Sequence, residues 1–259
     1  MNCILPRAII FAGPSFPPAV RPADPALEWR PPVKQGEVYQ AALTHPAIIG
    51  IIDGYFEVTP TVWHKEILWA MADGIHVFGA SSIGALRAAE LDVFGMKGIG
   101  RVYEDFRDGV LQDDDEVAVL HGPEELGYLS LTEAMVNIRA TLTAATTTCI
   151  VSHELAAELT AFAKALYYKE RSYQAMLNAA AVAGLDAVRL ARLRDWLPRG
   201  CIDQKRLDAL AMLNAIGAHL ESGAPRLRVT YALAETVAWQ AVVRRCLWAM
   251  RIEQSIKAL

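Results

Sequence analysis

Three short apolar runs near the start of the chain constrain its fold most. Ala8–Ala12 (AIIFA), Ala47–Ile52 (AIIGII) and Ile75–Phe78 (IHVF) are rich in β-branched and aromatic residues. Such runs are typical of strands buried on both faces, as in parallel sheets covered by helices. Between the last two runs, Thr61–Ala72 has apolar residues at helical spacing and stops before Gly74, which suits a helix C-terminus. The runs therefore predict a βαβ unit and a parallel α/β fold.

Beyond these runs the pattern becomes helical. Ser82–Leu91 is expected to be the next helix, and Val117–Leu120 is a possible fourth strand. From about residue 130 onward, Ala and Leu dominate and strand-like runs disappear. We predict an N-terminal α/β core domain at 1–145 that carries the functional site, and an all-helical region at 146–259 that is a candidate partner-binding surface.

A proline-rich segment interrupts the predicted core. Seven of the 13 prolines lie between Pro14 and Pro32. Proline has no amide donor and a fixed φ, so this segment is neither a regular helix nor a central strand. We expect an ordered loop, or a strap that faces a partner.

Charge and cysteine content exclude several classes of protein. There are 25 Lys and Arg against 29 Asp and Glu, a formal charge of −4, so we expect no broad basic surface for nucleic acid. No apolar stretch is long enough to span a membrane, and Met1–Arg7 lacks the pattern of a secretory signal, so we predict a cytoplasmic protein. The cysteines are scattered and predict reduced thiols, not a zinc site: Cys3, Cys149, Cys201 and Cys246.

Phosphate-binding and metal-binding motifs are also missing from the sequence. Neither GxxxxGK[ST] nor GxGxxG occurs. The acidic run Asp113–Glu116 cannot turn every carboxylate toward one ion, and it is more typical of a solvated turn. We therefore expect no metal and no cofactor.

The loops that follow the three strands are the first place to look for a site, because parallel strands place ligands at their carboxyl ends. These loops contain Gly13-Pro14-Ser15, then Asp53-Gly54, then Gly79–Gly84. In the third, Ala80-x-Ser82-x-Gly84 resembles a nucleophile elbow, apart from its first position. The amides at the start of the following helix could stabilise an oxyanion. The alternative is that Ser81 and Ser82 only cap that helix.

A nucleophilic serine needs a base, and the helix from Thr61 begins at the same edge of the sheet. Its first turns bring His64 and Lys65 into consideration, although either can equally be an ordinary surface residue. A lysine acts as a base only when burial lowers its pKa. Asp53 either orients such a base or makes a turn with Gly54. Arg87, paired with Glu90, is expected to support the site.

Long composite stretches resemble the TfuA-like family. They include FAGPS at 11–15, IGIIDGYFEVTPTVWHKEILWAMADG at 49–74, VFGASSIGALRAAEL at 77–91, GMKGIGRVYEDFRDG at 95–109 and DDDEVAVLHGP at 113–123. Together with LSLTEAMVNIRATL they cover about residues 8 to 142, and the helical remainder matches only loosely. One departure is Ile83, where family members commonly have Met.

The resemblance implies an accessory role beside a YcaO enzyme in backbone thioamidation of a peptide or protein substrate, including ribosomally synthesised peptides. The family partner helps to deliver sulfur from a thiocarboxylated ThiS-like carrier, and its hydrolase-like Ser-Lys pair maps onto Ser82 and Lys65. Gly13, Asp53 and Gly54 would then accept the tail of the carrier. The rival hypothesis is a non-catalytic adaptor that recruits substrate or carrier to YcaO. A general serine hydrolase is a weaker third hypothesis.

Overall fold

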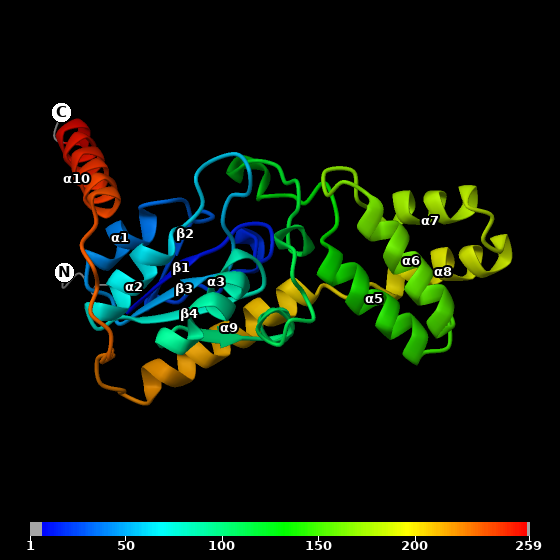
Figure 1. Cartoon of the computed structure of the whole chain (residues 1–259), viewed down its shortest axis with the longest axis horizontal. Helices are drawn as coiled ribbons and strands as arrows, with labels where there is room; N and C mark the ends of the chain where they lie inside the picture. Colours follow the sequence, from blue (N-terminus) through cyan, green and yellow to red (C-terminus); the bar gives the residue numbers. More distant parts are fainter. Residues whose placement is uncertain (1–6, 258–259) are drawn as a thin grey trace.

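In the computed structural model, which describes residues 7–257, a parallel sheet occupies one end of the molecule (Figure 1). Its five strands run in the order β2-β1-β3-β4-β5. Their bounds are β1 Ala8–Phe11, β2 Leu27–Arg30, β3 Ile48–Ile51, β4 His76–Ala80 and β5 Lys97–Ile99. In doubly wound sheets of this order, ligands bind where the carboxyl ends of β1 and β3 diverge.

Helices cover both faces of the sheet, as the buried strands require. Ile9 and Ile49 point to the face that is covered by α1 Glu37–Ala42, α2 His64–Ala72 and α3 Ile83–Leu91. Ile10 and Ile48 point to the opposite face, against α9 Gln204–Glu221. β1, β3 and β4 therefore bury alternate residues in two separate apolar layers, which is the reason that these three strands are mostly apolar.

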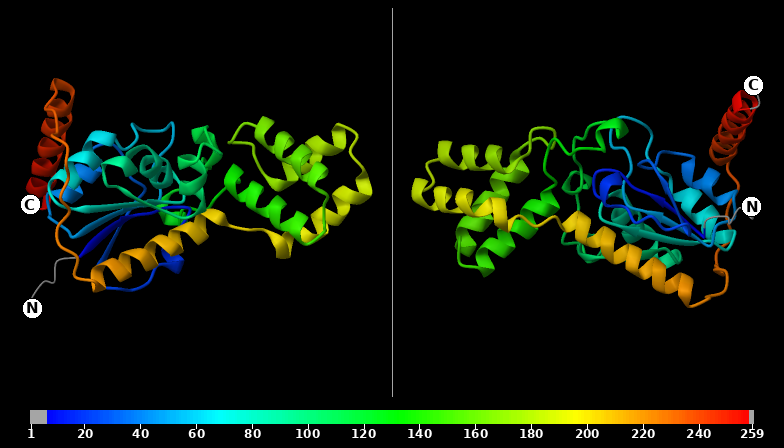
Figure 2. Two further views of the ribbon diagram at one scale, coloured as in Figure 1. Left: turned by 60° about the horizontal axis from the view of Figure 1, so that its bottom comes forward. Right: turned by 180° about the vertical axis from the view of Figure 1, so that it is seen from behind.

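A helical lobe follows the sheet in the chain. It comprises α5 Met135–Thr147, α6 His153–Ala165, α7 Tyr173–Val182 and α8 Ala187–Gly200, which share their own apolar core. The lobe projects to one side of the sheet, and α9 runs back from it along the sheet (Figure 2). α4 Arg101–Arg107 packs against α3, and α10 Val237–Lys257 packs on α1 at the far end.

The predicted fold class, a parallel α/β core followed by helices, is confirmed. The division is less simple than a boundary at residue 145, because that position lies inside α5 and α9 returns to complete the core. The sequence does not reveal this return, since the apolar face of a helix does not say which surface it covers.

Two strands were not predicted, and one predicted strand is wrong. β2 lies within the proline-rich segment, where Leu27–Arg30 is free of proline and forms an edge of the sheet. β5 is a three-residue strand, Lys97–Ile99, in a glycine-rich stretch. Val117–Leu120 forms no strand. The Val117–Leu120 segment is apolar because it packs beside a cavity, where Val117 and Ala118 are buried.

No helix in residues 7–257 combines the length and apolar character needed to cross a membrane. Cys149, Cys201 and Cys246 are free thiols. Cys3 and nearly all of the Met1–Arg7 segment lie outside the described residues.

Candidate functional site

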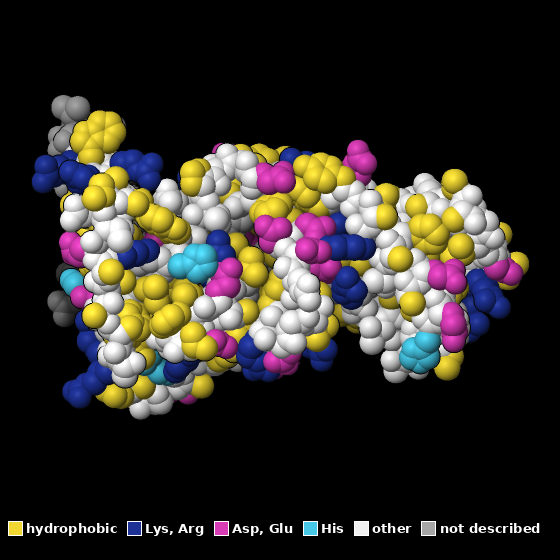
Figure 3. Space-filling view, in the orientation of Figure 1, with side chains coloured by type: hydrophobic (Ala, Val, Ile, Leu, Met, Phe, Trp, Pro, Cys, Tyr) yellow, Lys and Arg dark blue, Asp and Glu magenta, His cyan; other side chains and the backbone are white. Residues whose placement is uncertain are grey.

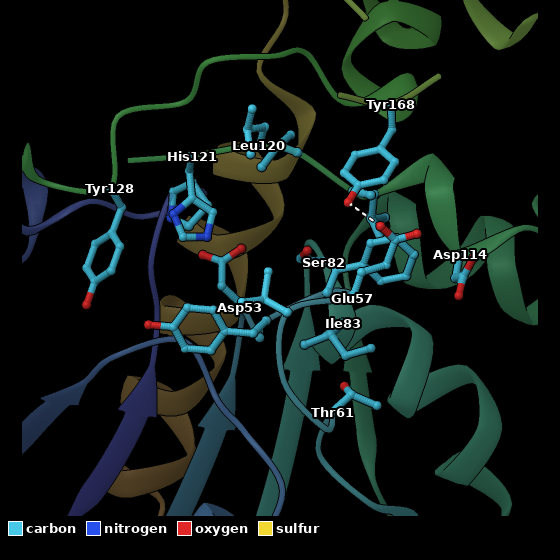
Figure 4. Close-up of a pocket in the computed structure, with 18 of the residues that line it drawn as sticks. Asp53, Glu57, Thr61, Ser82, Ile83, Asp114, Leu120, His121, Tyr128 and Tyr168 are labelled. Atoms are coloured by element: carbon cyan, nitrogen blue, oxygen red, sulfur yellow. Dashed lines mark hydrogen bonds between the residues drawn. The ribbon is translucent and has the colours of Figure 1, made fainter. Parts of the chain in front are cut away.

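A cavity of about 1100 Å³ opens at the carboxyl edge of the sheet, between the sheet and the helical lobe. We call it the main cavity. Its floor contains Asp53 and Ser82, and the segment around His121 forms one wall (Figure 4). Tyr168 closes another side from the helical lobe. The predicted edge of the sheet thus carries a large cavity, with Ser82 in its lining.

The turn from β4 to α3 is held by a very close approach of backbone. A Cβ added to Gly84 would lie 1.8 Å from the carbonyl oxygen of Ile51, and one added to Gly79 would lie 2.1 Å from that of Gly84. Only glycine fits at both places, which brings the start of α3 directly over the sheet. Small residues on either side of the serines are therefore a requirement of this turn.

The two serines of the turn have different environments. Ser81 has a left-handed backbone (φ +67°), is fully buried, and donates its hydroxyl to the backbone carbonyl of Lys205 at 2.7 Å. Ser82 is the residue that precedes α3, but its side chain makes no capping hydrogen bond to the helix. Its hydroxyl is therefore not used as a helix cap, and its side chain lines the main cavity.

Asp53 ties together the loops after β1 and β3. Its carboxylate accepts hydrogen bonds from the amides of Gly13 at 2.8 Å and Ser15 at 3.0 Å, and from the Ser15 hydroxyl at 2.6 Å. These donors are already engaged, so Gly13 and Ser15 act on Asp53 and do not line the main cavity. Pro14 and Gly54 do line it.

A lysine that the sequence analysis did not single out shares the main cavity with Ser82. Lys205, at the start of α9, is 3% exposed and its Nζ donates to the carbonyl of Val117 at 2.7 Å. Burial lowers the pKa of Lys205, although the charge of Asp53 acts in the opposite direction. A lowered pKa favours the neutral form of an amine, which can accept a proton. Asp203 caps α9 by accepting a hydrogen bond from the Arg206 amide. A capping residue in the sequence indicates where a helix starts, but it does not indicate that α9 packs back on the sheet.

Lys65 and His64 lie at the start of α2, but neither lines the main cavity. The Lys65 Nζ donates to the carbonyl of Ala234, in the segment before α10. His64 Nε2 lies 2.8 Å from a carboxylate oxygen of Glu90, which also pairs with Arg87 at 2.7 Å. Arg87 and Glu90 are part of the cavity lining. The structure thus places Ser82, Arg87 and Lys205 in the lining of one cavity.

The first amides of α3 are mostly engaged. The Ser82 amide donates to the Ala80 carbonyl at 2.8 Å, and the Gly84 amide donates to the Ile52 carbonyl at 3.3 Å. The Ile83 amide is therefore the candidate for contact with an oxyanion at this helix start.

Hydrogen bonds and ion pairs connect the outer walls of the main cavity to the helical lobe. Glu57, in the loop after β3, accepts a hydrogen bond from Tyr168 at 2.8 Å and pairs with Lys169 at 3.0 Å. Asp115 pairs with the fully buried Arg171 at 2.7 Å. Charged side chains of both signs gather where the lobe meets the sheet (Figure 3). The position of the lobe therefore sets the shape of the cavity.

Comparison with known proteins identifies the region that contains this site. The model of the TfuA-like protein family matches residues 53–172. This part of the chain is TfuA-like. The matched region includes Asp53 and Ser82, whereas Lys205 lies beyond it. No curated protein matches the chain. The TfuA-like match supports an accessory role in YcaO-associated thioamidation.

Proposed function

We propose that this TfuA-like protein releases sulfide from a thiocarboxylated ThiS-like carrier and supplies it to a YcaO enzyme that thioamidates a peptide or protein. The observation that carries the proposal is the position of Ser82, with a hydroxyl unused as a cap, in a cavity shared with a buried lysine. The family match supports the association with a YcaO enzyme. The cavity residues Ser82 and Lys205 support the proposed reaction.

In the proposed reaction, neutral Lys205 takes the proton of Ser82 as its Oγ attacks the thiocarboxylate carbon. The tetrahedral oxyanion is stabilised by the Ile83 amide. The C–S bond then breaks, and the proton on Lys205 passes to the departing sulfur, which leaves as hydrosulfide (HS⁻) because the thiocarboxylate enters as an anion. Water, deprotonated by the same amine, hydrolyses the Ser82 ester and frees the carrier with an ordinary carboxylate.

The sequence predicted Lys65 as the base, and we assign that role to Lys205. Burial gives Lys205 a lowered pKa, whereas Lys65 is engaged by a carbonyl outside the cavity lining. The two lysines can be compared directly. Lys205→Met should lower sulfide release by about 10² to 10³, as expected for loss of a general base, and Lys65→Met should retain most of it.

The test measures sulfide released from a purified carrier protein with a C-terminal Gly-Gly thiocarboxylate. Ser82→Ala should abolish release, while circular dichroism confirms that the variant is folded. Release should rise with pH in the unsubstituted protein, as Lys205 loses its proton, and this rise should be missing in Lys205→Met. Full release by Ser82→Ala would refute the proposed chemistry, and loss of release in Lys65→Met alone would return the base role to Lys65.

The adaptor hypothesis remains a second candidate, favoured by one observation. Among the described residues, α10 has large apolar side chains that stay exposed, including Trp248, which is 68% exposed. If Ser82→Ala sustains thioamidation in a reconstituted mixture with YcaO, while Trp248→Ala abolishes it, recruitment is the function.

A further inference from the structure

A second, smaller cavity lies directly behind Lys205. We call it the rear cavity; its volume is about 180 Å³. Pro14, Val119 and Lys205 line both cavities, so these three residues lie between one space and the other. The residue that we assign as the base therefore adjoins both spaces.

The rear cavity extends from the buried interior to the surface. At its inner end, Ser15 and Lys205 are 4% and 3% exposed. At its outer end, Ser130 and Cys201 are exposed to solvent. A volume of this size corresponds to roughly six water molecules at about 30 Å³ each. It therefore accommodates water and hydrogen sulfide but excludes a folded carrier protein.

Lys205 is anchored by its backbone and held less firmly at its tip. Its amide donates to the Asn137 side chain at 3.1 Å, and its carbonyl accepts the Ser81 hydroxyl at 2.7 Å. As a neutral amine, its Nζ has two N–H donors, of which the Val117 carbonyl takes one, and a lone pair that can accept a proton. The backbone of the residue is therefore fixed by two hydrogen bonds and the tip by one.

The proposed reaction creates a need for a second opening. When the C–S bond breaks, the acyl group of the carrier is bonded to Ser82, so its tail still occupies the way in through the main cavity. Sulfide that remains beside the ester can attack it and restore the thiocarboxylate. Release is productive only if sulfide escapes before the carrier does.

We propose that hydrogen sulfide leaves through the rear cavity while the carrier tail is still bound in the main cavity. This inference rests on the proposed function. The rear cavity also contains the carboxyl groups of Glu133 and Asp203, which disfavour an anion and favour neutral hydrogen sulfide. Protonation of the departing sulfur by Lys205 gives hydrosulfide, and a second proton, taken from solvent water, gives the neutral hydrogen sulfide that can pass.

Cys201 provides a means to block the outer end, and Cys149 provides a matched control. Cys149 is also an exposed free thiol, but it lines a different surface pocket beside the lobe. We would prepare Cys3→Ser/Cys149→Ser, which keeps Cys201, and Cys3→Ser/Cys201→Ser, which keeps Cys149. Each protein is assayed before and after alkylation with iodoacetamide, which is small, or with N-benzylmaleimide, which is bulky, after removal of excess reagent.

Bulky alkylation of Cys201 should lower kcat for sulfide release about tenfold, because product escape becomes rate-limiting. KM for the carrier and the shape of the pH profile should not change, since the carrier site and the base are untouched. Iodoacetamide should have a smaller effect, and alkylation of Cys149 should have none. Ser130→Trp, which narrows the same opening from the other side, should reproduce the loss.

An unchanged kcat after bulky alkylation of Cys201 and in Ser130→Trp would overturn the exit route. A raised KM with unchanged kcat would also overturn it, because the rear cavity would then be part of the carrier site. Failure of the proposed function is a separate result: sulfide release by the unmodified protein would not depend on Ser82.

Discussion

Arg171 provides a sharp test of how the cavity wall is attached to the helical lobe. Its guanidinium is fully buried and makes four hydrogen bonds, to the carbonyls of Ala163, Asp115 and Leu166 and to the carboxylate of Asp115. Arg171→Met keeps much of the apolar volume but leaves these acceptors without their donor. Removal of one partner of a buried ion pair costs about 3 to 5 kcal/mol. We expect a loss of that size in the free energy of unfolding.

Urea unfolding followed by circular dichroism measures this loss. In a chain of this length each kcal/mol lowers the melting temperature by about 2 to 4 °C, so the Arg171→Met variant should melt roughly 6 to 20 °C lower. Arg194→Met, on the exposed face of α8, is the matched control and should change stability by less than about 0.5 kcal/mol. A cost below about 1 kcal/mol for Arg171→Met would show that the lobe holds its position without this contact.

Three further predictions concern the turn, the wall and the loop of the cavity. Gly84→Ala should destabilise the protein by more than about 3 kcal/mol through a backbone clash. The control Gly217→Ala, which has open space around it in α9, should be neutral or stabilising by about 0.5 to 1 kcal/mol. Equal melting temperatures for the two variants would contradict the close turn. Burial acts to raise the pKa of Asp115, but hydrogen bonds from Lys164 and Arg171 outweigh it and hold that pKa below its usual value. Its stabilising effect should therefore be fully present above about pH 4, the pKa of an unfolded aspartate, and be lost as pH falls through the folded-state pKa. Asp115→Asn should remove that part of the acid dependence in unfolding curves, and an unaltered curve would argue against it. Glu57→Gln should raise KM for the carrier with little change in kcat, because it loosens the loop against the lobe; a loss confined to kcat would point to a chemical role instead.

The sequence predicted best those strands that are buried on both faces of the sheet. β1, β3 and β4 are apolar on both faces, so their runs are recognisable without knowledge of the neighbours. β2 is half-buried along its length and lies at an edge, so its composition is that of a loop. Val117–Leu120 has the apolar character of a strand because it lines a cavity.

The same reasoning explains what was found and missed in the site. Ser82 could be identified because the close turn between β4 and α3 leaves a local motif of small residues. Lys205 left no such motif: it is far from Ser82 in sequence, and only the return of α9 brings them to one cavity. Lys65 was predicted because its helix begins at the same edge of the sheet as Ser82 and because the Ser-Lys pair of the resembled family maps onto it.

The return of α9 has a consequence for synthesis of the protein. All five strands leave the ribosome before the lobe is made, and α9 emerges only after the lobe. Until then the sheet face that contains Ile10 and Ile48 lacks α9, and exposed apolar surface of this kind makes a nascent chain prone to aggregation. The lysine that we assign as the base arrives with the helix that covers this face. Under the proposed chemistry, a ribosome-bound chain that has completed only its sheet lacks its base, and the site is assembled in the same event that covers the sheet.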